Sequence, residues 1–202
     1  MQTYLSITKT IWVNGLFALL YSSCFAQTPI AELKDGSINK ALNLNYQIKK
    51  TTKYIDIENI NNRFTNIKQN SPRLHGQILT KPDIVIDVVK LSRICANHIS
   101  KQQIETLAAG IKYAGLMIDI KTDINGNTLE VSFFTEQNSI LTLNQLEKIE
   151  KELMTTKLVS MKPEILPLLE ESNFWRITPT IIYEDLLKVK LEMETSNQKE
   201  NN

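Results

Sequence analysis

The chain contains two cysteines and two histidines, and one of each, Cys95 and His98, lie close together in the sequence. A spacing of three residues places a thiol and an imidazole on one face of a helix, where the imidazole can activate the thiolate as a nucleophile. The interpretation we favour is structural, because Cys95 continues an apolar stripe with Val88 and Leu91. We therefore expect no catalytic residue, and the alternative is a hydrolase or thiol enzyme that uses Cys95 and His98.

No second group of residues has the composition of a catalytic or metal centre. A structural zinc site takes four Cys or His ligands, and only three such residues follow position 26. The carboxylate pairs at 170–171 and 184–185 are sequence neighbours, which point to opposite faces of a strand and form no acid–base couple. The sequence also lacks the nucleophile elbow, the phosphate loop, the Rossmann fingerprint and the His-Glu-x-x-His pair. We expect no metal ion and no cofactor.

The first 26 residues have the pattern of a secretory signal peptide, with the basic residue Lys9, the apolar run 11–20 and small residues up to Ala26. Cleavage after Ala26 predicts a periplasmic or extracellular chain that begins at Gln27. The alternative is a lipobox that ends at Cys24 and would anchor the chain to a membrane, although a tyrosine stands at its aliphatic position. Soluble export is the interpretation we favour.

Charge excludes one class of partner and suggests another. Without residues 1–26 the chain carries 22 basic and 22 acidic residues, so we expect no nucleic-acid partner. Basic residues are in excess between positions 40 and 81, which predicts a surface for anionic lipid headgroups, polysaccharide or an acidic partner. An ordinary solvated helix face is the alternative. The candidate basic face consists of Lys49, Lys50, Lys53, Arg63, Lys68 and Arg73.

The N-terminal part of the mature chain has weak periodicity. Residues 27–53 are polar and predict a mobile arm. The apolar positions Ile57, Ile60, Phe64 and Ile67 have helical spacing and predict one amphipathic helix. Proline-containing breaks at 70–82 suggest a boundary, so we divide the chain into a signal peptide (1–26), an arm with one helix (27–81), an α+β domain (82–190) and a disordered tail (191–202).

The C-terminal half carries clearer signals for helices and strands. Residues 84–98 predict a short strand that turns into a helix, and capping boxes begin helices at Ser100 and Thr142. Between these two helices, residues 116–133 alternate in polarity around Asn125-Gly126, which predicts a hairpin with a tight turn and one buried face. The expected fold is α+β: an antiparallel sheet built on this hairpin, with helices packed on one face, in the order helix, hairpin, helix, strand.

The closing strand at 174–183 contains Pro179, which confines it to a sheet edge or a bulge. An edge strand has free backbone groups that can pair with a partner strand or with a second copy of the chain. We therefore predict an exported, non-catalytic protein that binds another cell-envelope macromolecule by edge-strand addition. The candidate partner-binding residues are Trp175, Arg176, Ile177, Thr178 and Ile181.

The order of elements over residues 100–185 resembles the C-terminal domain of the TonB energy transducers and TonB-C-like modules of bacterial envelope proteins. The resemblance is carried by GLMIDIKTDINGNTLEVSFF, LTLNQLEKIEKEL and FWRITPTIIYEDL. It implies that the closing strand meets partner peptides. The chain has neither a Pro-rich spacer nor that family's Tyr-Pro dipeptide, so the resemblance does not extend to energy transduction. The chain also looks similar to small secreted bacterial domains of unknown function, which implies location and no activity.

Overall fold

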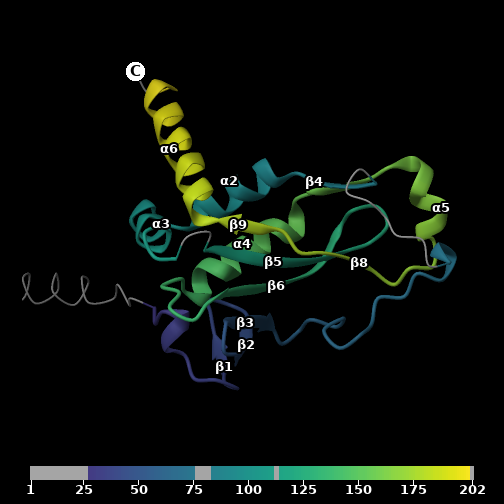
Figure 1. Ribbon diagram of the computed structural model, residues 1–202, viewed down its shortest axis with the longest axis horizontal. Coiled ribbons are helices and arrows are strands. Elements are labelled where there is room, and N and C mark those ends of the chain that lie inside the picture. The colour runs from purple at the N-terminus through teal and green to yellow at the C-terminus, as the bar shows by residue number, and fades with distance from the viewer. Residues whose placement is uncertain (1–26, 76–82, 112–113, 201–202) are drawn as a thin grey trace, which may run out of the picture.

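The computed structural model describes residues 27–75, 83–111 and 114–200, and the predicted signal peptide lies outside these ranges. The fold is α+β, as predicted, and its main sheet is antiparallel with seven strands (Figure 1). Their order is β1-β2-β3-β6-β5-β8, and β9 also pairs with β5. The strands are β1 (Ile38–Lys40), β2 (Asn45–Lys50), β3 (Tyr54–Asn59), β5 (Gly115–Thr122), β6 (Thr128–Glu136), β8 (Trp175–Ile177) and β9 (Thr180–Ile182).

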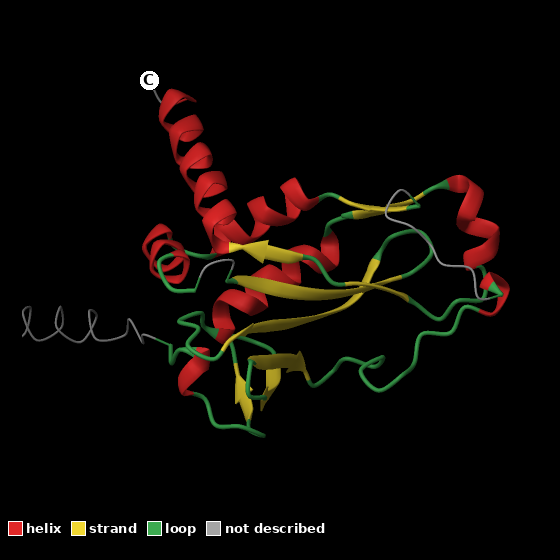
Figure 2. Cartoon of the chain, in the orientation of Figure 1, coloured by secondary structure: helices red, strands yellow, loops and turns green. Residues whose placement is uncertain are grey.

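The long helices gather on one side of this sheet (Figure 2). Apolar side chains from the helices and from the inner sheet face form one core that includes Ile57, Ile118, Phe133, Leu91 and Leu146. The long helices are α2 (Val88–His98), α3 (Lys101–Ala108), α4 (Leu143–Thr155) and α6 (Tyr183–Glu200). A separate antiparallel pair and four short helical turns complete the description: β4 (Ile84–Ile86), β7 (Val159–Met161), η1 (Ile30–Glu32), η2 (Pro72–Leu74), η3 (Pro163–Ile165) and α5 (Leu166–Leu169).

The prediction for the N-terminal part was wrong. The expected mobile arm supplies β1 and β2, and the expected amphipathic helix begins instead with β3. In β3 the relevant period is two, because Ile55 and Ile57 are fully buried in the core while Asp56 lies on the opposite face. The helical pattern was accidental, since Ile60 and Ile67 remain about half exposed. Pairing of β3 with β6, some 75 residues away, is a tertiary contact that decides the local conformation.

The strand-to-helix prediction for residues 84–98 is confirmed by β4 and α2, and Asp87 caps α2 by accepting a hydrogen bond from the Lys90 amide. Both predicted capping boxes are present, at Ser100 and at Thr142. The disordered tail was a wrong prediction, because α6 continues to Glu200. Its glutamate, glutamine and lysine residues are good helix formers. Lys101 and Glu194 also form an ion pair of 3.6 Å between α3 and α6.

The hairpin of β5 and β6 is confirmed, but its turn is longer than the predicted two-residue turn. Residues 123–127 connect the strands, and only Gly126 takes a positive φ there, of 79°. The Asp123 carboxylate accepts hydrogen bonds from the amides of Asn125 and Asn127, which closes the longer loop. The expected single buried face was also wrong. Both faces are covered, and the polar face of the hairpin holds Asp119 and Lys121 at 4% and 7% exposure.

Candidate functional site

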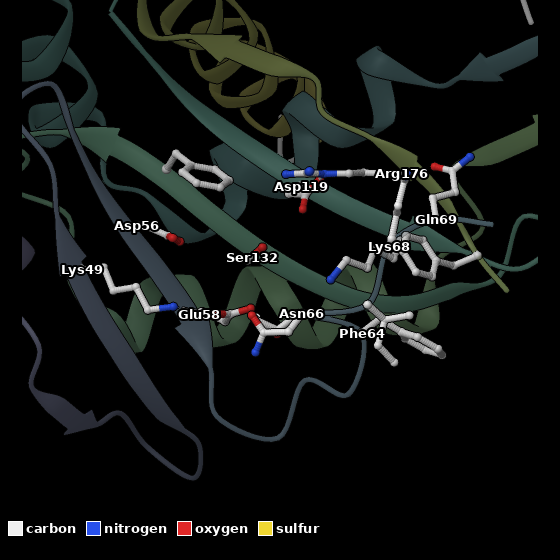
Figure 3. A pocket seen from close by; sticks show the side chains of 15 residues that line it. Lys49, Asp56, Glu58, Phe64, Asn66, Lys68, Gln69, Asp119, Ser132 and Arg176 are labelled. Atoms are coloured by element: carbon white, nitrogen blue, oxygen red, sulfur yellow. Dashed lines mark hydrogen bonds and ion pairs between the residues drawn. The ribbon is translucent and has the colours of Figure 1, made fainter. Parts of the chain in front are cut away.

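A polar pocket of about 470 Å³ lies on the outer face of the sheet, opposite the helices (Figure 3). Strand alternation explains its lining, because the residues between the core positions all face outward. Across the strands, Glu58 of β3 pairs in register with Ser132 of β6, and Ser132 pairs with Asp119 of β5. The lining side chains are Lys49, Asp56, Glu58, Phe64, Thr65, Asn66, Ile67, Lys68, Gln69, Asp119, Lys121, Ser132, Phe134, Phe174 and Arg176.

Ion pairs fix three of the cations that line this pocket. The Lys49 Nζ lies 3.5 Å from Glu58 Oε2, and the Arg176 Nε lies 2.7 Å from Asp119 Oδ1. The third cation, Lys121, pairs at 3.3 Å with Glu130, and both side chains of this pair are less than 10% exposed. Such buried pairs are costly to break, because the remaining charge would have no counter-ion. These three pairs form the charged floor of the pocket, and in the Lys121–Glu130 pair both side chains are buried.

The segment that follows β3 forms one wall of the pocket and is held by hydrogen bonds to carboxylates of the floor. The Glu130 carboxylate accepts hydrogen bonds from the amides of Arg63 and Phe64, and Thr65 donates its hydroxyl hydrogen to Glu58. The ring of Phe64 packs against that of Phe174, with centroids 5.3 Å apart. This wall could not be predicted from local patterns, because Glu130 and Phe174, which hold it, are distant in the chain.

Two charged groups of the lining form no ion pair within the described residues. Asp56 accepts no hydrogen bond there, and burial together with the nearby Glu58 charge raises the pKa of its carboxyl group. Lys68 has an exposed side chain, and only its backbone carbonyl is engaged, by a hydrogen bond from Asn173 of 3.0 Å. The side chains of Asp56, Ser132, Asp119 and Lys68 surround the same recess (Figure 3).

A second recess, an apolar groove of about 570 Å³, lies between β4 and the β8–β9 edge. Among the described residues its lining contains no charged side chain and consists of Ile84, Val85, Ile86, Val88, Ile177, Thr178, Pro179 and Thr180. We call it the edge groove. Only β7 pairs with β4, and only β5 pairs with β8 and β9, so the strands on both sides of the groove are edges within the described part of the chain.

The register shows which backbone groups these edges leave free. Lys162 donates its amide to Asp83, and Asp87 donates to Leu158, so alternation directs the N–H and C=O of Ile84 and Ile86 away from β7. The same alternation applies to the closing strand, where Ile118 donates its amide to Pro179 and Tyr183 donates to Ala114. The backbone groups of Thr178 and Thr180 therefore point away from β5.

The closing strand is at a sheet edge, as predicted, and Pro179 divides it into β8 and β9. Its carbonyl pairs with β5, so the missing N–H faces the sheet interior and interrupts the strand between β8 and β9. The candidate residues Trp175 and Ile181 are 6% and 2% exposed and pack inward, which removes their side chains as partner contacts. Ile177 and Thr178 line the edge groove, and Arg176 and Thr178 both hydrogen-bond Asp119.

The predicted basic residues do not form one helix face, because the helix is absent. Lys49 and Lys68 line the polar pocket, and Lys50 donates to the Ala31 carbonyl at 2.6 Å. Arg73 binds both Glu170 and Glu171, so this acidic pair has a structural partner on the surface. Lys53 lies exposed in the β2–β3 turn. Arg63 forms a described hydrogen bond through its backbone amide and none through its side chain.

Cys95 is completely buried in the core, and burial together with the Glu152 charge raises the pKa of its thiol to about 12. Its neighbour His98 is engaged elsewhere, with Nε2 at 2.7 Å from Glu152 Oε2. A neutral, buried thiol does not act as a nucleophile. In the described residues no group of three or more His, Cys, Asp or Glu side chains is arranged to hold a metal ion.

The acidic and basic residues of the pocket floor were missed at the level of sequence. Asp119, Lys121, Glu130 and Ser132 occupy the outward positions of the hairpin, where charge is ordinary for a solvent-facing strand. One signal was available, because Lys121 and Glu130 fall opposite each other in the register. Their burial could not be predicted from this, since it depends on Phe64 and Phe174 from other segments.

No family model matches the chain, and no curated protein matches it either. One solved structure with a similar fold is that of a DUF5043 family protein from Bacteroides uniformis ATCC 8492, with a TM-score of 0.60 and 16% sequence identity. The similarity covers 77% of this chain and 88% of that one. At this identity the likeness concerns the fold. None of the helices in the described ranges combines the length and apolar character needed to cross a bilayer.

Proposed function

We propose that this is an exported, non-catalytic protein that binds an extended segment of another cell-envelope protein in the edge groove. The observation that carries the proposal is the pair of unpaired strand edges, β4 and β8–β9, on the two sides of an uncharged groove. A strand placed there would take hydrogen bonds from backbone groups that otherwise have no strand partner, which is the usual source of affinity in strand addition.

The lining also defines the chemistry of the bound segment. Valine, isoleucine and threonine make up most of the lining, and no described side chain in it carries a charge that could compensate a buried one. We therefore expect a partner segment of uncharged, β-branched residues in extended conformation. Val85 and Val88, at 51% and 46% exposure, are apolar surface that such a segment would cover.

The test uses an array of uncharged hexapeptides rich in Val, Ile and Thr, followed by amide exchange on the strongest binder. We expect slower exchange at Ile84, Ile86, Thr178 and Thr180. The variant Thr180→Pro removes an outward N–H that no described residue uses, so it should preserve the fold and weaken binding. The matched control Thr180→Ala shortens the same side chain and keeps the outward backbone donor.

Protection confined to the segment 40–81 would refute the edge groove and favour the basic residues. Protection that grows with protein concentration and without peptide would show that the occupant is a second copy of the chain. Export is tested separately by intact mass, which we expect to correspond to a chain that begins at Gln27. A mass that matches a lipidated Cys24 would place the protein on a membrane.

A further inference from the structure

We propose that the polar pocket on the outer sheet face binds a small zwitterion of about dipeptide size, with an ammonium group at Asp56 and a carboxylate at Lys68. This inference is independent of the proposed function, because the edge groove has its own lining.

The charge balance of the pocket favours a ligand of zero net charge. Lys49, Lys121 and Arg176 are each paired with a carboxylate, from Glu58, Glu130 and Asp119 respectively. Among the charged lining residues this leaves one anion, Asp56, and one cation, Lys68, without an ion-pair partner in the described residues. Lys49 and Arg176 act electrostatically on Asp56 but form their ion pairs with other carboxylates, so a purely anionic or purely cationic ligand would give a direct partner to only one of the two groups. A zwitterion satisfies both.

The surroundings of Asp56 suit an ammonium group. Glu58 lies two residues along the same strand face and adds negative potential, and it also holds the Lys49 Nζ at 3.5 Å. Phe134 stands directly opposite Asp56 in the β3–β6 register, so its ring is within reach of a cation bound at the carboxylate. A carboxylate beside an aromatic ring is the usual chemistry of an ammonium site.

Lys68 is held at the other side of the pocket by its backbone. Asn173 donates a hydrogen bond of 3.0 Å to the Lys68 carbonyl, and Asn173 also accepts one from the Asn70 amide. These bonds fix the position from which the flexible side chain reaches a ligand carboxylate. The amide side chains of Asn66 and Gln69, which line the same wall and have no described partner, are suited to a peptide group between the two charged ends.

The experiment is a calorimetric titration of the full mature chain with dialanine, N-acetyl-dialanine and dialanine amide. We expect dialanine to bind, and each blocked peptide to bind at least about tenfold more weakly, because each has lost one charge-assisted contact. In Asp56→Asn the acetylated peptide should lose this disadvantage, and in Lys68→Gln the amide should lose it. Lys53→Gln, at an exposed lysine outside the pocket, is the matched control and should bind like the unmodified chain.

Failure of dialanine to bind at millimolar concentrations would overturn the inference, and so would equal binding of all three peptides. The comparison among peptides on the unmodified chain needs no variant, so a folding defect in Asp56→Asn would not obscure it. Thr180→Pro separates this inference from the proposed function, since it should weaken binding in the edge groove and leave dialanine binding unchanged.

Discussion

A methyl group added to a glycine can destabilise a protein through backbone strain or through a steric clash. Three glycines of this chain allow the two effects to be compared, and both apply at Gly126, at the tip of the hairpin. Gly36 has a φ of 71° with open space around it, whereas Gly115 lies where a Cβ would come within 2.6 Å of the Ile181 carbonyl oxygen. At Gly126 the φ is 79°, and a Cβ would overlap the Val159 carbonyl oxygen and lie 2.9 Å from its carbonyl carbon. Val159 belongs to β7, so the hairpin tip is packed directly against the backbone of the second sheet.

The alanine series gives an ordered expectation for the free energy of unfolding. Gly36→Ala should cost about 1 kcal/mol from backbone strain alone. Gly115→Ala should cost about 1–3 kcal/mol, because the contact is with backbone and β5 and β9 must separate. Gly126→Ala combines both effects and should cost about 2–4 kcal/mol. Urea unfolding followed by circular dichroism measures all three. If Gly126→Ala proved no more destabilising than Gly36→Ala, the packing of β7 on the hairpin tip would be refuted.

Three further predictions concern buried or half-buried titratable groups. Cys95→Ala should cost roughly 1–3 kcal/mol, and Cys95 should resist thiol reagents in the native state, because its thiol pKa is raised to about 12. Glu147 is fully buried, and despite the opposing effect of burial, bonds from Lys151, Asn43 and Leu44 lower its pKa to about 2. The stability it contributes should be lost as the pH falls from 4.5 towards 2, and Glu147→Gln should cost about 3 kcal/mol at neutral pH and remove this dependence in denaturant titrations. The pKa of Asp56 is raised in the folded protein, so its ionisation opposes folding at pH values above the ordinary pKa of an aspartate. Asp56→Asn should therefore stabilise the protein at neutral pH and make little difference at acid pH. Equal stability of Asp56→Asn and the unmodified chain at neutral pH would contradict the last expectation.

Local signals predicted those parts of the fold that depend on neighbouring residues. The capping boxes at Ser100 and Thr142 each need only a residue three positions away, and the hairpin needs only alternation around a glycine. β3 could not be predicted in this way, because it has a helical pattern of apolar residues and gains its hydrogen bonds from β6. Contacts over long sequence distances therefore decided the N-terminal half.

The buried carboxylates of α4 show a second limit of sequence patterns. Glu147 and Lys151 form an i,i+4 ion pair at 2.6 Å, a spacing that is typical of the solvent-facing side of a helix. Glu147 is instead buried beneath the β1–β2 turn, where it accepts hydrogen bonds from the amides of Asn43 and Leu44. Glu150 similarly accepts hydrogen bonds from Tyr46 and from Asn59. A polar residue on a helix therefore indicates solvent exposure only when no turn with unpaired backbone amides packs against it.

Asp119 connects the two recesses and explains how the closing strand stays in place despite its break. Pro179 has no N–H to donate to β5, so the ladder loses one bond between β8 and β9. On the outer face, the Asp119 carboxylate accepts hydrogen bonds from Arg176 Nε at 2.7 Å and from Thr178 Oγ1 at 2.9 Å. These side-chain bonds hold the strand on both sides of residue 177 without using its outward backbone groups. The edge is therefore fixed to the sheet by side chains, and its backbone remains available for an added strand.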